Sequence, residues 1–153
     1  MKKEGGIVLS VNTFVLREGK VLLGKRKGKV GEGKWALPGG KLGFWEKMSD
    51  CARRELVEET GLVARSIKFL QFINDIRDED GTHCIHIQFL AEGVEGEPKL
   101  MEPEKCYEWG WFPLNNLPEN LFLGHQKFFP TLKDKVAIVD VDKVLLKHEG
   151  QEW

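Results

Sequence analysis

Three glutamates close together in the chain have the spacing of metal ligands. Glu55, Glu58 and Glu59 lie at i, i+3 and i+4 in a stretch without Gly or Pro that consists mostly of good helix formers. We predict a helix over about 47–60, ended by Gly61. At roughly 100° per residue the three carboxylates share one flank of this helix. Like charges so placed repel one another, so a cationic partner is expected.

A group of carboxylate oxygens with open coordination positions suits Mg²⁺, or Mn²⁺ as a substitute, when the ion carries substrate phosphates. The alternative is a solvated charged face, which is the usual meaning of a charge run on a helix. The preceding run Trp35-Ala-Leu-Pro-Gly-Gly40 favours the metal site, because it is typical of a strand that turns into a glycine loop just before the helix. Such a loop lets the backbone approach a ligand closely.

The spacing of these residues resembles the Nudix box, Gx5Ex7REUxEExGU with U aliphatic. Every specified position is filled, from Gly40 through Glu46 and Arg54 to Leu62. The flanking runs VLLGKRKGKVGEGKWALPGGKL and EPEKCYEWGW resemble the MutT-like branch of Nudix hydrolases, which includes triphosphate diphosphatases active on guanine and thioguanine nucleotides.

Two residues inside the box differ from what relatives often carry. Gly43 stands where Glu is common, and Trp45 stands where Gly is common.

The resemblance implies a role for each residue of the box. Metal ions would be held by Glu55, Glu58, Glu59 and the carbonyl of Gly40. Arg54, with Glu46 as its partner, would hold the glutamates in position, and Glu55 would be the general base, a role that differs among Nudix enzymes.

One more carboxylate would reach the metal from the loop before the last expected strand. Glu102 and Glu104 are the candidates, and Pro103 between them directs their side chains apart. We expect Glu104 to be the ligand, because it lies closer to the strand and would be held more firmly. The alternative is that both are solvated.

Substrate contacts are expected from basic and apolar residues outside the helix. Arg26, in the basic turn Lys25-Arg26-Lys27, would contact a phosphate near the glycine loop that contains Gly39. By resemblance, the wall for the nucleobase would come from Leu37 and from the turn Phe122-Leu123-Gly124. The plainer interpretation of these residues is solubility for the basic turn and core packing for the aromatic rings.

The expected reaction is Mg²⁺-dependent hydrolysis of a nucleoside triphosphate, including a modified or oxidised one, to the monophosphate and pyrophosphate. The signatures of relatives that act on ADP-ribose, diadenosine polyphosphates, NADH or coenzyme A are missing. Two alternatives stay open. One is hydrolysis of another nucleoside diphosphate derivative, such as a nucleotide sugar or dinucleotide. The other is a non-catalytic nucleotide-binding module, although such modules usually have an eroded box.

Composition bounds the remaining properties. With 153 residues, 41% of them hydrophobic, we expect a single domain over 1–153. A net charge of −1 gives no strong electrostatic attraction to a nucleic-acid polymer or a membrane surface. Three widely spaced cysteines without a signal peptide indicate reduced thiols and a cytoplasmic protein. Many Nudix relatives pair, so a homodimer is compatible with the resemblance.

Strands and helices alternate, which predicts an α/β class, and the resemblance specifies an α/β/α sandwich around a mixed sheet. Strands are expected over 7–16 and 20–25, which form a hairpin, and over 65–76, 82–91 and 106–112. Asn120 is expected to cap a second helix over 121–133 that kinks or breaks near Phe129, before Pro130. Residues 136–146 fit either a strand or a short helix.

Overall fold

The computed structural model describes residues 5–130, 132, 136–140 and 143–147, the last two ranges by their backbone only. The elements follow the order β1 (Val8–Arg17), β2 (Lys20–Arg26), β3 (Trp35–Ala36), β4 (Gly39–Lys41), α1 (Met48–Thr60), β5 (Ser66–Arg77), β6 (Thr82–Glu92), β7 (Cys106–Pro113), α2 (Leu123–Phe128), β8 (Val136–Asp140) and β9 (Lys143–Lys147).

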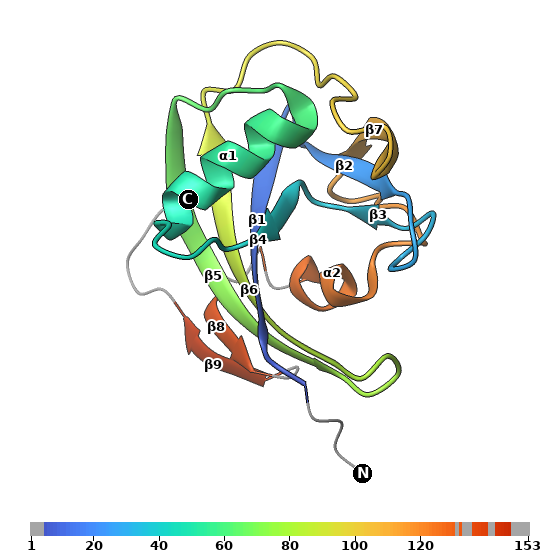
Figure 1. The fold of residues 1–153 in the computed structure, drawn as a ribbon. Coiled ribbons are helices and arrows are strands. Elements are labelled where there is room, and N and C mark those ends of the chain that lie inside the picture. Colours follow the sequence, from blue (N-terminus) through green and yellow to red (C-terminus); the bar gives the residue numbers. More distant parts are fainter. Residues whose placement is uncertain (1–4, 131, 133–135, 141–142, 148–153) are drawn as a thin grey trace.

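The strands form one mixed sheet in the order β3-β2-β1-β6-β5-β8-β9, with β4 paired to β1 and β7 paired to β2. β1 runs parallel to β6 and antiparallel to β2 and β4, and β5 and β6 are long antiparallel neighbours (Figure 1). The α/β class predicted from the sequence is confirmed, because the described residues form a mixed sheet with a helix on each face.

The two helices pack against residues that alternate along β1. Val11 lies in one apolar cluster with Cys51 and Ala52 of α1, whereas Phe14 lies in another with Phe128 of α2. Neighbouring side chains of a strand point to opposite faces of a sheet, and an odd separation of three residues therefore places these two on opposite faces. Each helix thus covers its own face.

α1 forms where the sequence predicts it. Ala52 and Leu56 are buried under the helix, as their positions beside the glutamates require. Gly61 adopts φ 72°, and its N–H donates to the carbonyl of Val57. A residue with a Cβ is strained at this φ, so glycine ends the helix at little cost.

The strands also match their expected ranges closely. The turn between β1 and β2 places Glu18 at φ 49° and Gly19 at φ 72°, as a tight hairpin requires. Residues 136–146, for which a strand or a helix was left open, contain β8 and most of β9.

The second helix is shorter than predicted. α2 spans Leu123–Phe128 with Phe122 at its N-cap, and Asn120 does not cap it. Leu121 instead bridges Trp35 of β3, which keeps this segment extended, and the Asn120 side chain donates to the carbonyl of Gly33 at 2.9 Å. Phe129 is the C-cap, just before Pro130, and residue 133 lies outside the described residues.

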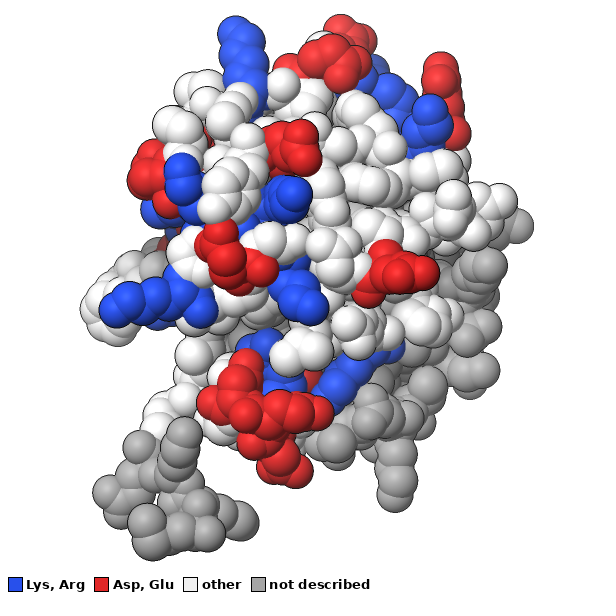
Figure 2. Space-filling model, turned by 90° about the vertical axis from the view of Figure 1, so that its right-hand side faces the viewer, with Lys and Arg blue, Asp and Glu red and all other residues white. Residues whose placement is uncertain are grey.

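The surface carries charges of both signs. On the face seen in Figure 2, Lys and Arg side chains alternate with Asp and Glu, and no stripe of one sign stands out there. No helix in the described ranges has the length and apolar character needed to cross a membrane.

Candidate active site

Arg54 holds three glutamates of the Nudix-like stretch. Its Nε lies 2.7 Å from Oε1 of Glu46, and its Nη1 lies 2.7 Å from Oε1 of Glu55 and 3.1 Å from Oε2 of Glu58. The hydrogen bonds from Arg54 lower the pKa of Glu46 to about 2, with help from the Gly43 N–H. Glu46 and Glu55 raise the pKa of Arg54 in return. The expected contact between Arg54 and Glu46 is therefore present, and the Arg54 guanidinium orients all three glutamates.

Glycines 39 and 40 let the backbone approach its neighbours where β4 pairs with β1. A Cβ on Gly39 would lie 2.2 Å from the carbonyl oxygen of Val11, and a Cβ on Gly40 would lie 2.3 Å from Oε1 of Glu55. Real Cβ atoms do not approach other atoms so closely. The Glu55 carboxylate can lie against the loop backbone only because position 40 has no side chain.

Glu55, Glu58 and Glu59 of α1 form what we call the glutamate row, and within it Glu59 has the most strongly shifted pKa. Burial raises its pKa to about 8, and the charges of Glu55 and Glu102 act in the same direction. A weak hydrogen bond from the Gly39 N–H, 3.4 Å from Oε2, opposes this shift. A carboxylate that is desolvated among like charges is a good place for a bound cation.

Glu59 and Glu102 line the same small pocket, here called the glutamate pocket. It has a volume of about 50 Å³ and is lined by Gly24, Arg26, Ala36, Leu37, Gly39, Glu59, Glu102, Lys105, Cys106 and Trp109. Glu104 is not among these residues. Of the two candidates from this loop, the one that faces Glu59 is therefore Glu102, and not Glu104 as expected. The short turn explains the difference, because Lys105 N and Cys106 N both donate to the Glu102 carbonyl and fold the chain back over that residue.

A larger cavity of about 400 Å³ adjoins the glutamate pocket, and we call it the arginine cavity. It is lined by Val8, Ser10, Asn12, Arg26, Val30, Ala36, Leu37, Gly39, Gly40, Lys41, Arg77, Thr82, Cys84, His86, Phe122 and His125. Arg26, Ala36, Leu37 and Gly39 line both spaces. The two therefore meet at the glycine loop.

A model of the NUDIX domain matches residues 7–132, which is most of the chain. The chain belongs to the Nudix family. Among solved structures, it resembles a MutT Nudix hydrolase from Burkholderia pseudomallei, with a TM-score of 0.76, 30% identity and coverage of 82% of this chain and 98% of the other.

Two relatives differ in the substrates that their names give. An oxidized purine nucleoside triphosphate hydrolase from Danio rerio is 35% identical over 151 residues, with 91% of each chain covered. An ADP-ribose pyrophosphatase from Methanocaldococcus jannaschii is 36% identical over 120 residues, covering 78% of this chain and 69% of the relative. The predicted class, a MutT-like Nudix hydrolase of nucleotide phosphoanhydride bonds, is confirmed.

Nudix hydrolases generally use divalent metal ions, and the donor set here fits an ion that arrives with its substrate. Within the described residues, no three Asp, Glu, His or Cys side chains are grouped so as to hold an ion by themselves. Mg²⁺ does not need such a cage, because it is commonly bound by one or two carboxylates together with substrate phosphates. Glu59 couples electrostatically to Glu55 and to Glu102, so pairs of this kind are available.

The expected substrate-binding residues are only partly brought together. Arg26, Leu37, Gly39 and Phe122 line the arginine cavity, whereas Leu123 is 38% exposed and does not. Gly124 lies behind the cavity, where a Cβ would approach the carboxylate of Asp75 and the ring of His86. The Phe122 ring already has two guanidinium groups over it, those of Arg26 at 4.6 Å and Arg77 at 5.1 Å.

A buried polar group at the back of this cavity was not predicted. Oδ2 of Asp75 lies 3.2 Å from Nε2 of His86 and 3.3 Å from Nε of Arg77, and Nδ1 of His86 lies 3.0 Å from Oδ1 of Asn12. Burial alone would raise the pKa of Asp75, but its cationic and hydrogen-bonding neighbours hold it below the usual value. The signal in the sequence was that Asp75 and Arg77 lie two apart in β5, which places both side chains on one face of the sheet.

Proposed function

We propose that this Nudix hydrolase cleaves a nucleoside triphosphate, including a modified or oxidised one, to the nucleoside monophosphate and pyrophosphate with Mg²⁺. The observation that carries the proposal is the junction at Gly39. Glu59 and Glu102 line the pocket on one side of it, and a cavity large enough for a base and sugar lies on the other. A nucleotide that spans this junction would place its phosphates beside the glutamates.

The metal would be held by Glu55, Glu58, Glu59 and the Gly40 carbonyl, with Glu102 as the further carboxylate. When bound, a divalent cation neutralises the polyphosphate and lowers the pKa of an attacking water. The raised pKa of Glu59 supports this assignment, since its environment favours a compensating positive charge.

The remaining steps fall to side chains of the chain itself. Arg54 orients Glu55 through Oε1, and we assign the other oxygen, Oε2, to accept the proton of the attacking water. Arg26 lines both cavities, so its guanidinium lies where the phosphates must pass. Arginine binds phosphate oxygens in a bidentate manner, which would align the chain of phosphates.

A second candidate substrate is ADP-ribose or a related dinucleotide. The relative from Methanocaldococcus jannaschii supports it by name and by its 36% identity. The absence of the ADP-ribose signature from the segment around Ile76, Arg77 and Asp78 argues for the triphosphate instead.

The test is a panel of nucleoside triphosphates, nucleotide sugars and ADP-ribose with Mg²⁺ in ¹⁸O-water, scored for each phosphate product. We expect monophosphate and pyrophosphate, with a triphosphate as the best substrate. Orthophosphate as the first product would refute the proposed cleavage site, and ADP-ribose as the best substrate would favour the second candidate. Binding of nucleotides without turnover would point to the non-catalytic module.

A further inference from the structure

Arg26 lies where the glutamate pocket and the arginine cavity meet, and its two Nη atoms have no protein partner there. The residue lines both spaces. Its Nε donates to the carbonyl of Val30 at 3.1 Å. In the described part of the chain neither Nη atom has a hydrogen-bond or ion-pair partner, and neither is among the fully buried nitrogens that lack one. The two Nη atoms are therefore accessible to a ligand at the junction.

The guanidinium of Arg26 lies over the ring of Phe122. Its central carbon is 4.6 Å from the ring centroid, within the range of a cation–π contact. Burial lowers the pKa of Arg26, and the negative charge of Glu59 opposes that shift. A cation–π contact is stronger for a desolvated cation than for a fully hydrated one. The ring and the carbonyl of Val30 together fix the guanidinium, so its free Nη atoms point in one set direction.

The Phe122 ring is itself held by several groups of the protein. The backbone N–H of Phe122 donates to the carbonyl of Trp35 at 2.8 Å. A Cβ on Gly31 would lie 2.6 Å from Cδ2 of the ring, so the backbone of the loop before β3 lies against the ring edge. The Arg77 guanidinium, whose Nε is 3.3 Å from Asp75, also lies over the ring, at 5.1 Å. The ring is therefore a fixed platform under Arg26.

We infer that Phe122 is a positioning residue whose ring holds Arg26 so that the two Nη atoms meet the phosphates of the nucleotide. The family resemblance implies a wall for the base at this position, whereas the role inferred here acts on the phosphates through Arg26. The inference rests on the proposed function, because that function brings the phosphates to the junction. Cation–π contacts change equilibria by about 3-fold at exposed sites and by about 30-fold when desolvated. Removal of the ring should weaken phosphate binding within this range.

The test uses inorganic tripolyphosphate, which offers the phosphates of a nucleotide without a base. Calorimetry with Mg²⁺ gives its dissociation constant for the wild-type protein, Phe122→Leu and Phe122→Tyr. Phe122→Leu removes the ring and should weaken binding by about 3- to 30-fold. Phe122→Tyr keeps an aromatic face under Arg26 and should bind within about twofold of the wild type. Equal binding by the wild type and Phe122→Leu would overturn the inference, because a wall for the base does not act on a ligand without one.

A double-mutant cycle shows whether the ring acts through Arg26. Arg26→Gln alone should weaken tripolyphosphate binding by at least about tenfold, the effect of losing hydrogen bonds from a charged group. Phe122→Leu should add less than about twofold to this loss, because no guanidinium is left to position. Full additivity of the two losses would refute the role through Arg26. The matched control is Phe44→Leu, which should leave binding unchanged, because Phe44 is 93% exposed and no guanidinium of the described residues lies over its ring.

A measurement on the wild-type protein covers the case in which Phe122→Leu does not fold. Protons that lie over an aromatic ring resonate upfield, so the side-chain protons of Arg26 should be shifted upfield in NMR spectra. The shifts of an ordinary exposed arginine would overturn the inference. Triphosphate hydrolysis together with tripolyphosphate binding that does not depend on Phe122 would refute the inference and leave the proposed function standing. Tripolyphosphate binding that depends on Phe122, without hydrolysis of any nucleoside triphosphate, would do the opposite.

Discussion

The glutamate pocket and the arginine cavity share a wall at Gly39 but balance their charges in opposite ways. Glu59 faces the like charges of Glu55 and Glu102, and burial raises its pKa to about 8. Arg77 has Asp75 and Asp80 behind it, within 3.3 and 3.5 Å. The glutamate pocket therefore carries uncompensated negative charge. In the arginine cavity, Asp75 and Asp80 balance the positive charge of Arg77. The first therefore favours an added cation, whereas the positive charge of Arg77 in the second is already balanced.

The largest effect on turnover is expected for a glutamate of α1 that would hold the metal. Glu58→Gln should lower turnover by at least about 100-fold, in the range of losing one key electrostatic group. The free energy of unfolding should change little, because relief of the repulsion within the row offsets the lost ion pair with Arg54. Steady-state rates at saturating Mg²⁺ and urea titrations measure the two effects.

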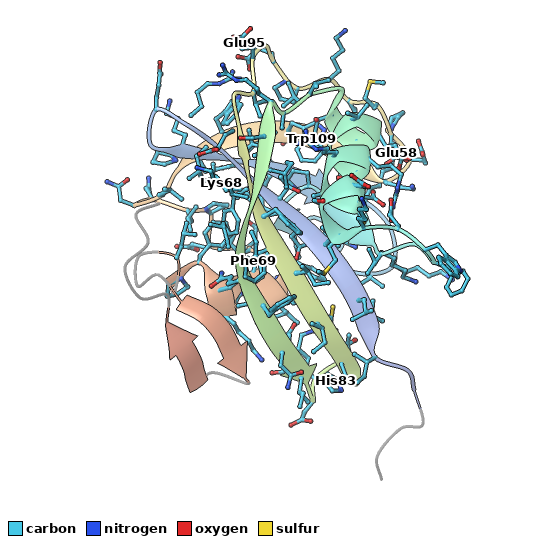
Figure 3. The ribbon with its side chains drawn as sticks, turned by 90° about the vertical axis from the view of Figure 1, so that its left-hand side faces the viewer. Glu58, Lys68, Phe69, His83, Glu95 and Trp109 are labelled. Carbon is cyan, nitrogen blue, oxygen red and sulfur yellow. The ribbon has the colours of Figure 1, made fainter. Side chains whose placement is uncertain are left out.

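The control for this variant is Glu95→Gln, the same change on the loop before β7. Figure 3 shows Glu58 on the outer side of α1 and Glu95 far from it. Glu95→Gln should leave turnover unchanged. Near-normal turnover of Glu58→Gln would remove the metal role from the row, and unfolding of that variant would indicate a structural role.

The second effect decides which carboxylate of the loop serves the glutamate pocket. Glu102→Gln should raise the Mg²⁺ concentration for half-maximal activity by at least about tenfold, in the range seen when a group supporting a metal site is lost. Glu104→Gln is the matched control and should leave the Mg²⁺ dependence unchanged, since it does not line the pocket. The reverse result would restore the expectation from the sequence, and no effect of either would leave α1 to hold the metal alone.

A third effect concerns the pH dependence of stability without metal. The pKa of Glu59 rises from 4.5 to about 8 on folding, so between these values the folded protein binds more protons than the unfolded chain. Protonation of Glu59 therefore contributes its full stabilisation below the pKa that this residue has in the unfolded chain. As the pH rises from there through about 8, the free energy of unfolding falls by up to about 1.4 kcal/mol per pH unit.

Urea titrations in EDTA across this range measure that loss. Glu59→Gln should flatten the decline, and Mg²⁺ should reduce it in the wild type by favouring the ionised carboxylate. Glu95→Gln should keep the wild-type slope. A wild-type stability that is level or rises with pH across this range would show that Glu59 is not desolvated among like charges.

The two regions also differ in how far the sequence predicts them. Glu46, Arg54 and the three glutamates lie in one continuous stretch, so the period of a single helix predicts which of them meet. The arginine cavity gathers residues from β1, β2, β5, β6 and the turn before α2, and no spacing along the chain marks such a set. Only the family resemblance pointed to its Leu37 and Phe122.

Two placements differ from what the sequence led us to expect, for different reasons. Leu121 has a helical pattern around it, but its bridge to Trp35 holds it extended and delays α2 to Leu123. Glu104 is nearer the strand in sequence, but the turn closed by the Glu102 carbonyl puts Glu102 over the pocket. In the first case a partner distant in the chain overrides the local helical preference. In the second a local turn decides which carboxylate faces the pocket, and the metal ligand from this loop stays a prediction.

The smallest effect concerns backbone strain at Trp45, the residue before Glu46. Trp45 adopts φ 62° and is 90% exposed, so it stays in the left-handed region without burying its ring. For a residue with a Cβ this conformation costs about 1–2 kcal/mol, and glycine would relieve it while losing about 0.5–1 kcal/mol of chain entropy. Trp45→Gly should therefore raise the free energy of unfolding by up to about 1 kcal/mol.

Phe44→Gly is the matched control, because Phe44 is 93% exposed and is not among the residues with positive φ. Without strain to relieve, that substitution should only lose chain entropy and lower stability by about 0.5–1 kcal/mol. Urea titrations of both variants give the sign of each change. Equal losses would show that Trp45 is not strained, whereas a gain for Trp45→Gly with reduced turnover would show that the strain helps to place Glu46 and the row behind it.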